Sequence, residues 1–347
     1  MAMLQDYVSL LWADVVADRT DELQSTMLDF LDGIGQNEAV DPITLPGAEG
    51  EISGISYRVL GSGPPLVLLP LGLAPSQWGP LLPCLSQKYF TIIMGGPSLG
   101  WTSILESRGI SGFLTGIRNL IDEIDVQPGE SILEVGCGSG VGSRCLARRT
   151  SRANHITAVD LSPYLLGEAE ALARREGIGD FIEFREGNAE ALDFPDDSFD
   201  VTFSVTVMEE VNAARMFGEL VRVTKPGGRV AVIVRAEDRP LQVNLTLRPE
   251  LKAKAEAPGG ARPGSVEGGC ADASLYQMFS NAGLIHLKMF PHLAASAQTS
   301  WRETLSGHIL PSLTSMEIQE WQTAVEQAGD TFFIATPLHC AVGTIPG

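Results

Sequence analysis

Residues 132–140, with the sequence ILEVGCGSG, constrain the possible folds of this chain more than any other segment. The apolar start is typical of a buried strand, and the glycines that follow, at positions 136, 138 and 140, alternate with other residues. Such a turn lets the backbone approach a ligand, which then meets the free N–H groups at the start of the next helix. The spacing differs from the Gly-x-Gly-x-x-Gly pattern of nicotinamide-binding folds, which use a similar turn. The segment therefore predicts a strand, a ligand-binding turn and a helix.

Strand and helix patterns alternate from residue 128 onward. Strands are predicted at 131–135, 155–160, 182–186, 201–206 and 228–235, with helices at 143–150, 163–176 and 213–223. A helix at 274–282 and strands at 284–290 and 331–336 resume the domain. Alternation at this spacing specifies an α/β fold with a doubly wound, mostly parallel sheet.

Three further motifs follow the glycine turn in order. Asp160 ends the next strand, twenty residues beyond Gly140, where a carboxylate can accept both hydroxyls of a ribose. Residues 187–190 (GNAE) close the third strand, and residues 222–228 (RVTKPGG) lead into the fifth. With these motifs, residues 128–236 resemble class I S-adenosylmethionine-dependent methyltransferases, in the motif style of the ubiquinone/menaquinone, sterol and tocopherol methyltransferase group. The resemblance implies a seven-stranded Rossmann-like sheet, S-adenosyl-L-methionine as cofactor and S-adenosyl-L-homocysteine as product.

The resemblance also implies which residues hold the cofactor: Glu134, Gly136, Cys137, Gly138, Gly140, Asp160, Leu161, Asn188 and Ala189. The turn would lie beneath the methionine part of the cofactor, with Glu134 bracing the turn and facing the amino group. Asp160 would hold the ribose, and Leu161 would lie against the adenine. Asn188 would meet the adenine amino group with the backbone of Ala189 beside it, or else Asn188 is a turn residue.

The segment after the fourth strand departs from the family pattern. Where relatives often have a His-His pair near the methyl donor, this chain has Glu209 and Glu210. These acids would bind a cationic substrate, attract the sulfonium or act as a general base, or they only suit the dipole at a helix start. Because methyl transfer is an in-line displacement, a base is needed only if the nucleophile must lose a proton. The other candidate bases are His286, His292, His308 and His339.

Two arginines and a loop-rich insertion are candidates for binding the acceptor. Arg235 and Arg239 follow the fifth strand, where they would hold an acceptor carboxylate. Residues 237–274 are rich in glycine and proline, and we interpret them as a lid. Five scattered cysteines without a Cys-x-x-Cys pair give no support for a disulfide framework or a metal site.

The chain ahead of the glycine turn divides into two predicted segments. Residues 1–45 fit amphipathic helices that contribute to a homodimer or else pack against their own chain, and residues 42–54 read as a linker. Residues 46–105 resemble the opening of an α/β-hydrolase, and residues 96–100 satisfy Gly-x-Ser-x-Gly. We interpret this piece as a remnant β-layer without a working triad, because a nucleophile elbow needs a different position in the fold. The methyltransferase domain would then occupy residues 106–347, with insertions at 237–274 and 291–329.

Composition restricts the possible partners. The 347 residues carry 43 acidic against 24 basic side chains, so a basic face for nucleic acid is absent. The longest apolar run, at residues 64–75, is too short and too broken for a membrane span, and the start of the chain does not resemble a signal peptide. We therefore expect a cytoplasmic enzyme that methylates a small-molecule acceptor. The alternatives are a protein that binds adenosylmethionine for another reaction, or an interaction protein that uses its acidic N-terminal helices.

Overall fold

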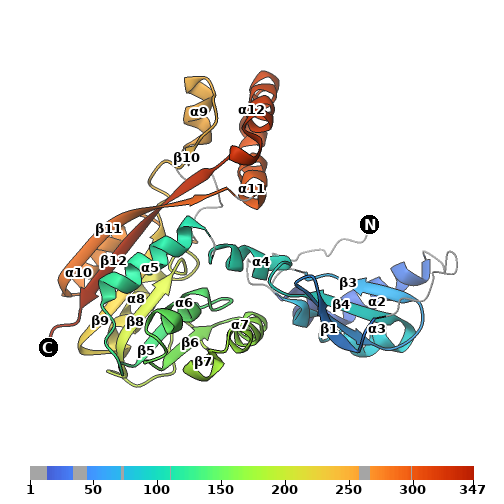
Figure 1. Cartoon of the computed structure of the whole chain (residues 1–347), viewed down its shortest axis with the longest axis horizontal. Coiled ribbons are helices and arrows are strands. Elements are labelled where there is room, and N and C mark those ends of the chain that lie inside the picture. The colour runs from blue at the N-terminus through green and yellow to red at the C-terminus, as the bar shows by residue number, and fades with distance from the viewer. Residues whose placement is uncertain (1–13, 34–44, 72–73, 110, 258–265, 298) are drawn as a thin grey trace. The chain divides into compact units, whose positions relative to one another are not determined.

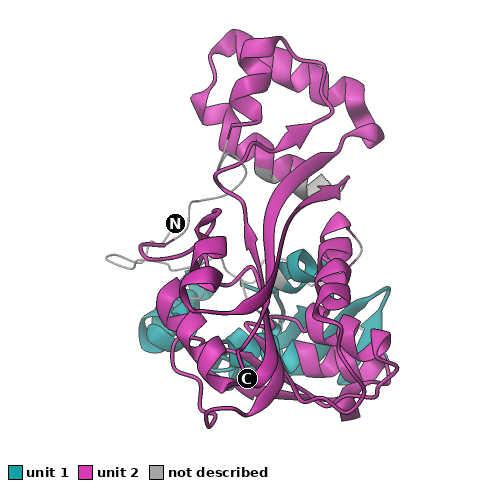
Figure 2. Ribbon diagram, turned by 90° about the vertical axis from the view of Figure 1, so that its left-hand side faces the viewer, with its two compact units in different colours: residues 1–106, 162–168 teal, residues 107–161, 169–347 magenta. Residues whose placement is uncertain are grey.

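The computed structural model describes residues 14–33, 45–71, 74–109, 111–257, 266–297 and 299–347. The chain folds as two compact units (Figure 2). One unit comprises Met1–Glu106 and Ser162–Glu168, and the other comprises Ser107–Leu161 and Ala169–Gly347. The segments 1–45 and 46–105, separated in the sequence analysis, thus fall within one unit.

The larger unit is built on a sheet of eight strands in the order β10-β12-β9-β8-β5-β6-β7, with β11 also paired to β12 (Figure 1). Its strands are β5 (Ile132–Val135), β6 (Ile156–Asp160), β7 (Ile182–Glu186), β8 (Phe199–Val205), β9 (Thr224–Arg235), β10 (Gln242–Val243), β11 (Ile285–Ser296) and β12 (Ile334–Thr344). Strands β5 to β9 run parallel, whereas β12 is antiparallel to β9, β10 and β11. The predicted α/β class is confirmed. The expected count of seven strands is corrected to eight, because the two-residue strand β10 pairs with the start of β12.

Amphipathic helices cover the sheet. They are α5 (Gly112–Ile124), α6 (Val141–Arg149), α8 (Ala213–Val223) and α10 (Ser274–Asn281), with a 3₁₀ turn at Gly179–Phe181. Helix α7 (Pro163–Arg175) is divided between the two units after Glu168. Helix α8 buries Met216, Phe217 and Leu220 in one core with Leu275 and Phe279 of α10. Helix α5 packs on β9, β11 and β12, and its backbone at Gly112 lies against Ala294 and Ala295 of β11. Burial of apolar side chains by these helices holds the sheet in place.

The C-terminal part of the larger unit forms a second, smaller core. Helices α9 (Pro249–Ala255), α11 (Thr299–Ile309) and α12 (Ser315–Ala328), with 3₁₀ turns at Leu310–Ser312 and Gly329–Thr331, surround the buried Trp321. The insertion predicted at 237–274 contains the strand β10 and the helix α9, and residues 258–265 of it lie outside the described residues; its interpretation as a lid stays a prediction.

The closing strands are longer than the sequence indicated. Strand β12 begins at Ile334 and runs to Thr344, not over 331–336, and β11 continues to Ser296. The sequence pattern predicted too short a strand because Pro337 and His339 interrupt the apolar run in β12. In the sheet, β12 is paired on both sides, which accommodates these residues.

The smaller unit contains a four-stranded sheet in the order β1-β2-β4-β3, in which only β3 and β4 run parallel. Its elements are α1 (Val15–Asp18), α2 (Thr20–Gly33), β1 (Glu49–Ile52), β2 (Ile55–Leu60), β3 (Pro65–Leu68), a 3₁₀ turn at Pro75–Trp78, α3 (Leu82–Lys88), β4 (Phe90–Gly95) and α4 (Gly100–Ser107). The predicted linker at 42–54 is wrong over 49–52, because these residues form β1 and pair with β2. Of the two predicted N-terminal helices, the part before residue 14 lies outside the described residues.

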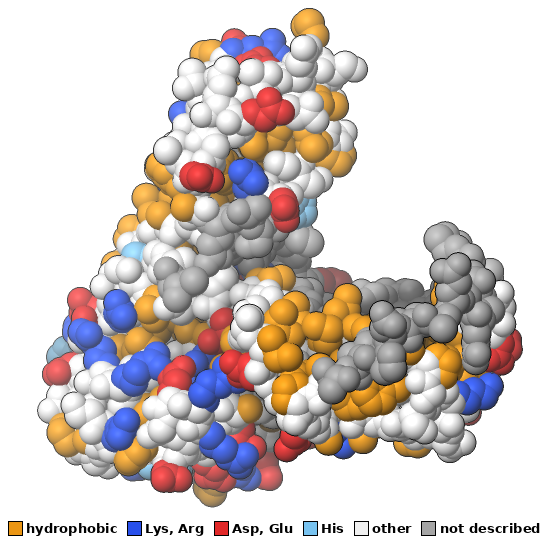
Figure 3. All heavy atoms as spheres, turned by 45° about the vertical axis from the view of Figure 1, so that its right-hand side comes forward, with side chains coloured by type: hydrophobic (Ala, Val, Ile, Leu, Met, Phe, Trp, Pro, Cys, Tyr) orange, Lys and Arg blue, Asp and Glu red, His pale blue; other side chains and the backbone are white. Residues whose placement is uncertain are grey.

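The smaller unit has its own apolar core and a partly apolar surface. Trp78, Leu81 and Leu85 are buried, and residues of α2 pack against them. Large hydrophobic side chains also remain exposed on this unit, namely Phe30, Ile52, Val67, Leu69 and Leu71; Figure 3 shows hydrophobic side chains on one face of the molecule. Ser98 of the Gly-x-Ser-x-Gly sequence follows β4, and all five histidines of the chain lie beyond residue 150, in the other unit. This unit therefore has no histidine of its own for a catalytic triad.

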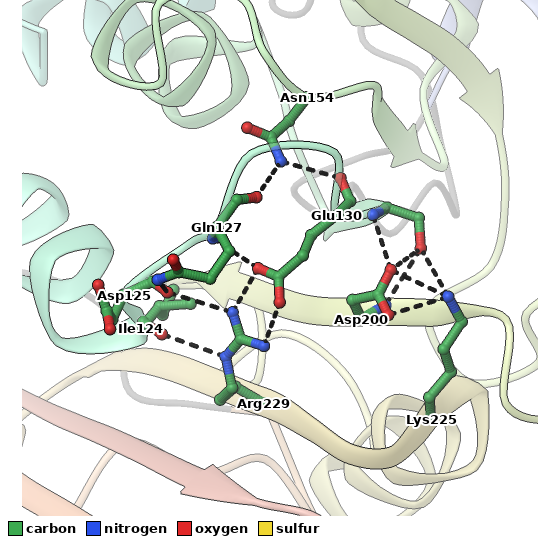
Figure 4. Close-up of polar contacts among 9 residues, drawn as sticks. Ile124, Asp125, Gln127, Glu130, Asn154, Asp200, Lys225 and Arg229 are labelled. Atoms are coloured by element: carbon green, nitrogen blue, oxygen red, sulfur yellow. Dashed lines mark hydrogen bonds and ion pairs between the residues drawn. The ribbon is translucent and has the colours of Figure 1, made fainter.

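Polar contacts join the amino ends of strands β5, β8 and β9 (Figure 4). Oδ2 of Asp200 accepts hydrogen bonds from the backbone N–H (2.9 Å) and hydroxyl (2.7 Å) of Ser131, and Nζ of Lys225 lies 2.9 Å away. Burial alone would raise the pKa of Asp200, but the hydrogen bonds from Ser131 and the pairing with Lys225 lower it to about 2. Beside them, Arg229 makes a two-pronged pair with Glu130. This edge is thus occupied by structural contacts, which leaves the carboxyl edge for ligands.

Candidate functional site

The glycine turn between β5 and α6 has the geometry that the sequence predicts. Gly136, Gly138 and Gly140 have φ angles of 74°, 55° and 79°, a region that favours glycine. A Cβ atom on Gly136 would lie 2.2 Å from a methyl carbon of Val207, so a side chain does not fit there. Gly140 is the N-cap of α6 and offers no side-chain cap to the helix. The turn therefore brings backbone close to the carboxyl edge and leaves helix N–H groups for a ligand.

Glu134 braces this turn from inside the sheet. Its side chain is buried, and Oε2 accepts a hydrogen bond from the backbone N–H of Ser143 at 2.7 Å and a second one from the Ser143 hydroxyl. Burial raises the pKa of Glu134 to about 7, although the hydrogen bonds from Ser143 oppose the shift. A Cβ on Gly142 would lie 2.1 Å from Oε1 of Glu134, so Gly142 and Ser143 also belong to the turn. Neither residue was among the predicted site residues, although both continue the glycine pattern in GSGVGS.

Asp160 and Leu161 lie where β6 ends. Oδ2 of Asp160 accepts a hydrogen bond from the backbone N–H of Gly138 at 2.7 Å, which ties the turn to the neighbouring strand. Leu161 is 59% exposed, unusual for a leucine between a buried strand and a helix. A carboxylate and an exposed apolar side chain thus stand side by side in the sequence at the carboxyl edge. Their predicted contacts with ribose and adenine stay predictions.

The other predicted cofactor residues have mixed surroundings. Oδ1 of Asn188 accepts a hydrogen bond from the backbone N–H of Glu190 at 2.9 Å, as expected of a turn residue, and Ala189 packs against the core. Cys137 is buried, and burial raises the pKa of its thiol well above the ordinary value. Cys137 is therefore a neutral thiol, and the turn relies on its backbone.

The carboxyl ends of β8 and β9 bring three acids to one arginine. Oε1 of Glu209 accepts a hydrogen bond from the backbone N–H of Arg235 at 2.6 Å, and Oε1 of Glu210 lies 2.7 Å from Nη2 of Arg235. Oε1 of Glu237 lies 3.6 Å from Nε of the same guanidinium. Arg235 is thus surrounded by carboxylates of its own chain. Its predicted role, and that of the mostly exposed Arg239, in holding an acceptor carboxylate stay predictions, with an internal role as the alternative.

Glu209 differs from the other two acids in its burial. Its side chain is fully buried, and among the described residues its Oε2 atom has no hydrogen-bond partner. Burial raises the pKa of Glu209 to about 7, partly opposed by the charge of Arg235. This acid can therefore exchange a proton near neutral pH.

The insertion after β10 covers this acid with backbone. The N–H of Val266 donates to the carbonyl of Glu209, and the N–H of Cys270 donates to the carbonyl of Met208, both at 2.9 Å. The N–H of Glu237 donates to the carbonyl of Ala271 at 2.7 Å. The segment 266–271 is thus hydrogen-bonded across the exits of β8 and β9, a contact that the sequence pattern did not reveal.

Among the candidate histidines, His339 is the one that the structure brings to this edge. It is buried; its Nε2 lies 2.8 Å from Oδ1 of Asp238, and its Nδ1 lies 2.9 Å from the Tyr276 hydroxyl. In the neutral tautomer with the proton on Nε2, the ring would donate to Asp238 and accept from the Tyr276 hydroxyl. His292 instead holds the carbonyl of Gly112 on α5. His286 and His308 are exposed, on β11 and α11.

Two absences apply to the described ranges alone. There, no group of three or more histidine, cysteine or acidic side chains is arranged to hold a metal ion. In the same ranges, no helix has the length and apolar character needed to cross a membrane.

The segment that carries the glycine turn is similar to known methyltransferases. Residues 133–232 match the family model described as a methyltransferase domain. The sterol 24-C-methyltransferase ERG6B of Gibberella zeae is 33% identical over 110 residues, which are 31% of this chain and 28% of the relative. A probable chloroplastic tocopherol O-methyltransferase of Oryza sativa subsp. japonica is 34% identical over 113 residues, which are 32% of this chain and 30% of the relative. The matches thus span about a third or less of these relatives.

A ubiquinone/menaquinone biosynthesis C-methyltransferase of Hahella chejuensis is 32% identical over 117 residues, which are 33% of this chain and 47% of the relative. Among solved structures, the YcgJ protein of Bacillus subtilis matches 67% of this chain and 99% of its own, with 16% identity and a TM-score of 0.46.

Proposed function

We propose that this chain, in which residues 133–232 match a methyltransferase domain, is a class I S-adenosylmethionine-dependent methyltransferase that transfers a methyl group to a small-molecule acceptor. The observation that carries the proposal is the bond between Oδ2 of Asp160 and the N–H of Gly138. It joins the two motifs from which the nucleoside site is predicted, the glycine turn and the acidic strand end. The relatives named above, all methyltransferases of small molecules, support the same activity.

The residues of the carboxyl edge fit S-adenosylmethionine. This cofactor supplies an electrophilic methyl group on a positively charged sulfur. The backbone of the glycine turn would receive its methionine part, Asp160 would accept the ribose hydroxyls, and Leu161 would cover the adenine. The three left-handed glycines leave room for this approach, because a Cβ at Gly136 would already collide with Val207.

The acids after β8 would act on the acceptor. In-line displacement requires that the nucleophile be held opposite the sulfur and that water be excluded. In our proposal Glu209 holds or accepts the acceptor proton, and Glu210 keeps the Arg235 guanidinium in place. Segment 266–271, hydrogen-bonded above Glu209, would exclude water from this point.

The activity is tested by release of S-adenosylhomocysteine from the full chain supplied with S-adenosylmethionine and a broad panel of metabolites. Methyl transfer predicts release with a subset of acceptors. Tight cofactor binding with no release from any acceptor would contradict the proposal and favour the alternative, a methyltransferase fold that serves another reaction.

We also propose that the protein is a cytoplasmic homodimer that contacts its partner copy through the N-terminal helices and does not bind nucleic acid. Phe30 of α2 is 62% exposed, which supports an apolar surface on this helix that a second copy would cover. Leu23 and Met27, in contrast, pack within their own unit. Light scattering at micromolar concentration should give twice the chain mass, and removal of residues 1–40 should give the single mass. A monomeric full chain would contradict the dimer. An unchanged oligomeric state and unchanged partner binding after the deletion would contradict any docking role of these helices.

A further inference from the structure

The oxygen Oε2 of Glu209 is the feature that leads beyond methyl transfer in general. The side chain is fully buried, and Oε2 has no hydrogen-bond partner among the described residues. A buried polar atom without a partner loses its hydration with nothing in return, so native proteins rarely keep one without a reason. The other oxygen is fixed by the backbone N–H of Arg235 at 2.6 Å, which sets the orientation of the carboxyl group. Nε of Arg235 is likewise buried without a hydrogen-bond partner among the described residues, but it lies 3.7 Å from Oε1 of Glu209, beyond hydrogen-bond distance. Oε2 is therefore an acceptor that no donor of the described residues satisfies.

The charges around this oxygen indicate what kind of donor fits. The exits of β8 and β9 carry four acids and two arginines: Glu209, Glu210, Glu237, Asp238, Arg235 and Arg239. The acids outnumber the arginines by two when Glu209 is ionised and by one when it is neutral, and either surplus disfavours an anionic acceptor and favours a cationic one. Arg235 offers little compensation, because all three glutamates lie within 4 Å of its guanidinium.

We propose, on the basis of the methyl transfer inferred above, that the acceptor is an amine that arrives as its ammonium form and donates an N–H to Oε2 of Glu209. Glu209 takes a proton from the ammonium nitrogen and becomes a neutral carboxylic acid. The freed nitrogen lone pair forms the new N–CH₃ bond while the S–CH₃ bond breaks, and its electron pair stays on sulfur. The products are a methylated ammonium and the neutral thioether, S-adenosylhomocysteine. Charge and protons balance without a further reactant.

A purely structural role for Glu209 is the competing explanation, because Oε1 already closes the end of β9 through Arg235. Glu209→Gln separates the two roles, since the amide oxygen can still accept from the Arg235 N–H while the negative charge and the base are lost. The matched control is Asp122→Asn, which removes an exposed carboxylate on α5 that pairs with Arg149.

The experiment uses the full chain and acceptors that share one skeleton and differ in the terminal group. The probes are phenethylamine, 2-phenylethanol and phenylacetate, together with hexylamine, hexanol and hexanoate. Binding of S-adenosylmethionine is measured first by calorimetry, and release of S-adenosylhomocysteine second. The proposal predicts release with at least one amine and at least 10-fold less with the matched alcohol and carboxylate. Glu209→Gln should reduce the rate with the amine by about 100-fold, the usual contribution of a general base, and leave cofactor affinity unchanged.

The pH profile distinguishes a base from a structural residue. The wild-type rate should rise with pH as Glu209 loses its proton near its pKa of about 7, and this limb should be absent in Glu209→Gln. Release from alcohols or carboxylates in preference to amines would overturn the proposal, as would an unaltered rate in Glu209→Gln or the absence of any amine turnover by cofactor-bound protein. Failure to bind S-adenosylmethionine would instead overturn the proposed function.

Discussion

A single carboxylate, Asp160, joins the turn of β5 to the end of β6, because its Oδ2 accepts the Gly138 N–H at 2.7 Å. Sequence spacing was enough to place this residue, since the acid falls at a fixed point of a strand–turn–helix pattern. The surroundings of Arg235 and His339 could not be predicted in the same way. Those contacts join residues 25 to 101 positions apart, from Glu210 to Arg235 and from Asp238 to His339, and only the folded sheet brings them together.

Replacing Asp160 tests the cofactor site directly. We expect Asp160→Ala to weaken S-adenosylmethionine binding by about 10- to 100-fold, because a charge-assisted hydrogen bond is worth about 1.5 to 3 kcal/mol. Asp160→Asn should lose less, since its amide oxygen can still accept from Gly138. Calorimetry measures both affinities, and an alanine variant that binds as tightly as wild type would remove Asp160 from the site.

Acid stability tests the polar contacts at the opposite edge. The folded pKa of Asp200, about 2, lies below the ordinary value of 3.8, so its contribution is present above about pH 4 and is lost as the pH falls toward 2. We expect Asp200→Asn to reduce the free energy of unfolding by about 1 kcal/mol at neutral pH, a value discounted for partial exposure. Urea titrations should show the gap between variant and wild type narrowing below about pH 4. A difference in unfolding free energy between wild type and Asp200→Asn that grew in acid would contradict the stabilising pair of Asp200 with Lys225.

Among elements, the strands and helices that border the glycine turn followed the sequence closely, and α8 was predicted with the observed bounds, 213–223. Periodicity was informative there because each helix buries one face against a parallel sheet. Strands β1, β10 and the second half of β12 were missed. The residues of β1 are mostly polar, β10 has two residues, and a proline interrupts β12. These segments form strands only because a neighbouring strand provides the backbone hydrogen-bond partners.

Replacing glycine by alanine should have opposite effects on stability in the glycine turn, where the backbone needs a positive φ, and in helix α8, where it does not. We expect Gly136→Ala to destabilise the larger unit by about 1 to 3 kcal/mol and to abolish cofactor binding, because its Cβ meets Val207 at 2.2 Å with φ at 74°. The matched control is Gly218→Ala in α8, where an added Cβ would have no atom within 4 Å. The higher helix propensity of alanine should raise the free energy of unfolding of this variant by roughly 0.5 to 1 kcal/mol. Thermal unfolding measures the stability of both variants, and calorimetry measures their cofactor binding. A Gly136→Ala variant that is as stable as wild type and binds the cofactor as tightly would contradict the geometry of the turn.

The described residues form an eight-stranded α/β sheet with a small C-terminal core in the larger unit, and a four-stranded sheet in the smaller unit. The net charge of −19 does not report on the acceptor by itself, because residues 1–60 alone carry eleven acids against two arginines. The local surplus at the exits of β8 and β9 is the informative one. Sequence arithmetic could not locate it, since Glu209 and Glu210 come to Arg235 only through the parallel pairing of β8 with β9.

Titration of S-adenosylmethionine into the full chain, followed by calorimetry, tests this interpretation most directly. The structure predicts saturable binding with one cofactor per chain, at a dissociation constant in the micromolar range or below, and competition by S-adenosylhomocysteine. The same titration into Gly136→Ala should give no binding heat. Absence of saturable binding to the wild-type chain, or equal binding by wild type and Gly136→Ala, would contradict it.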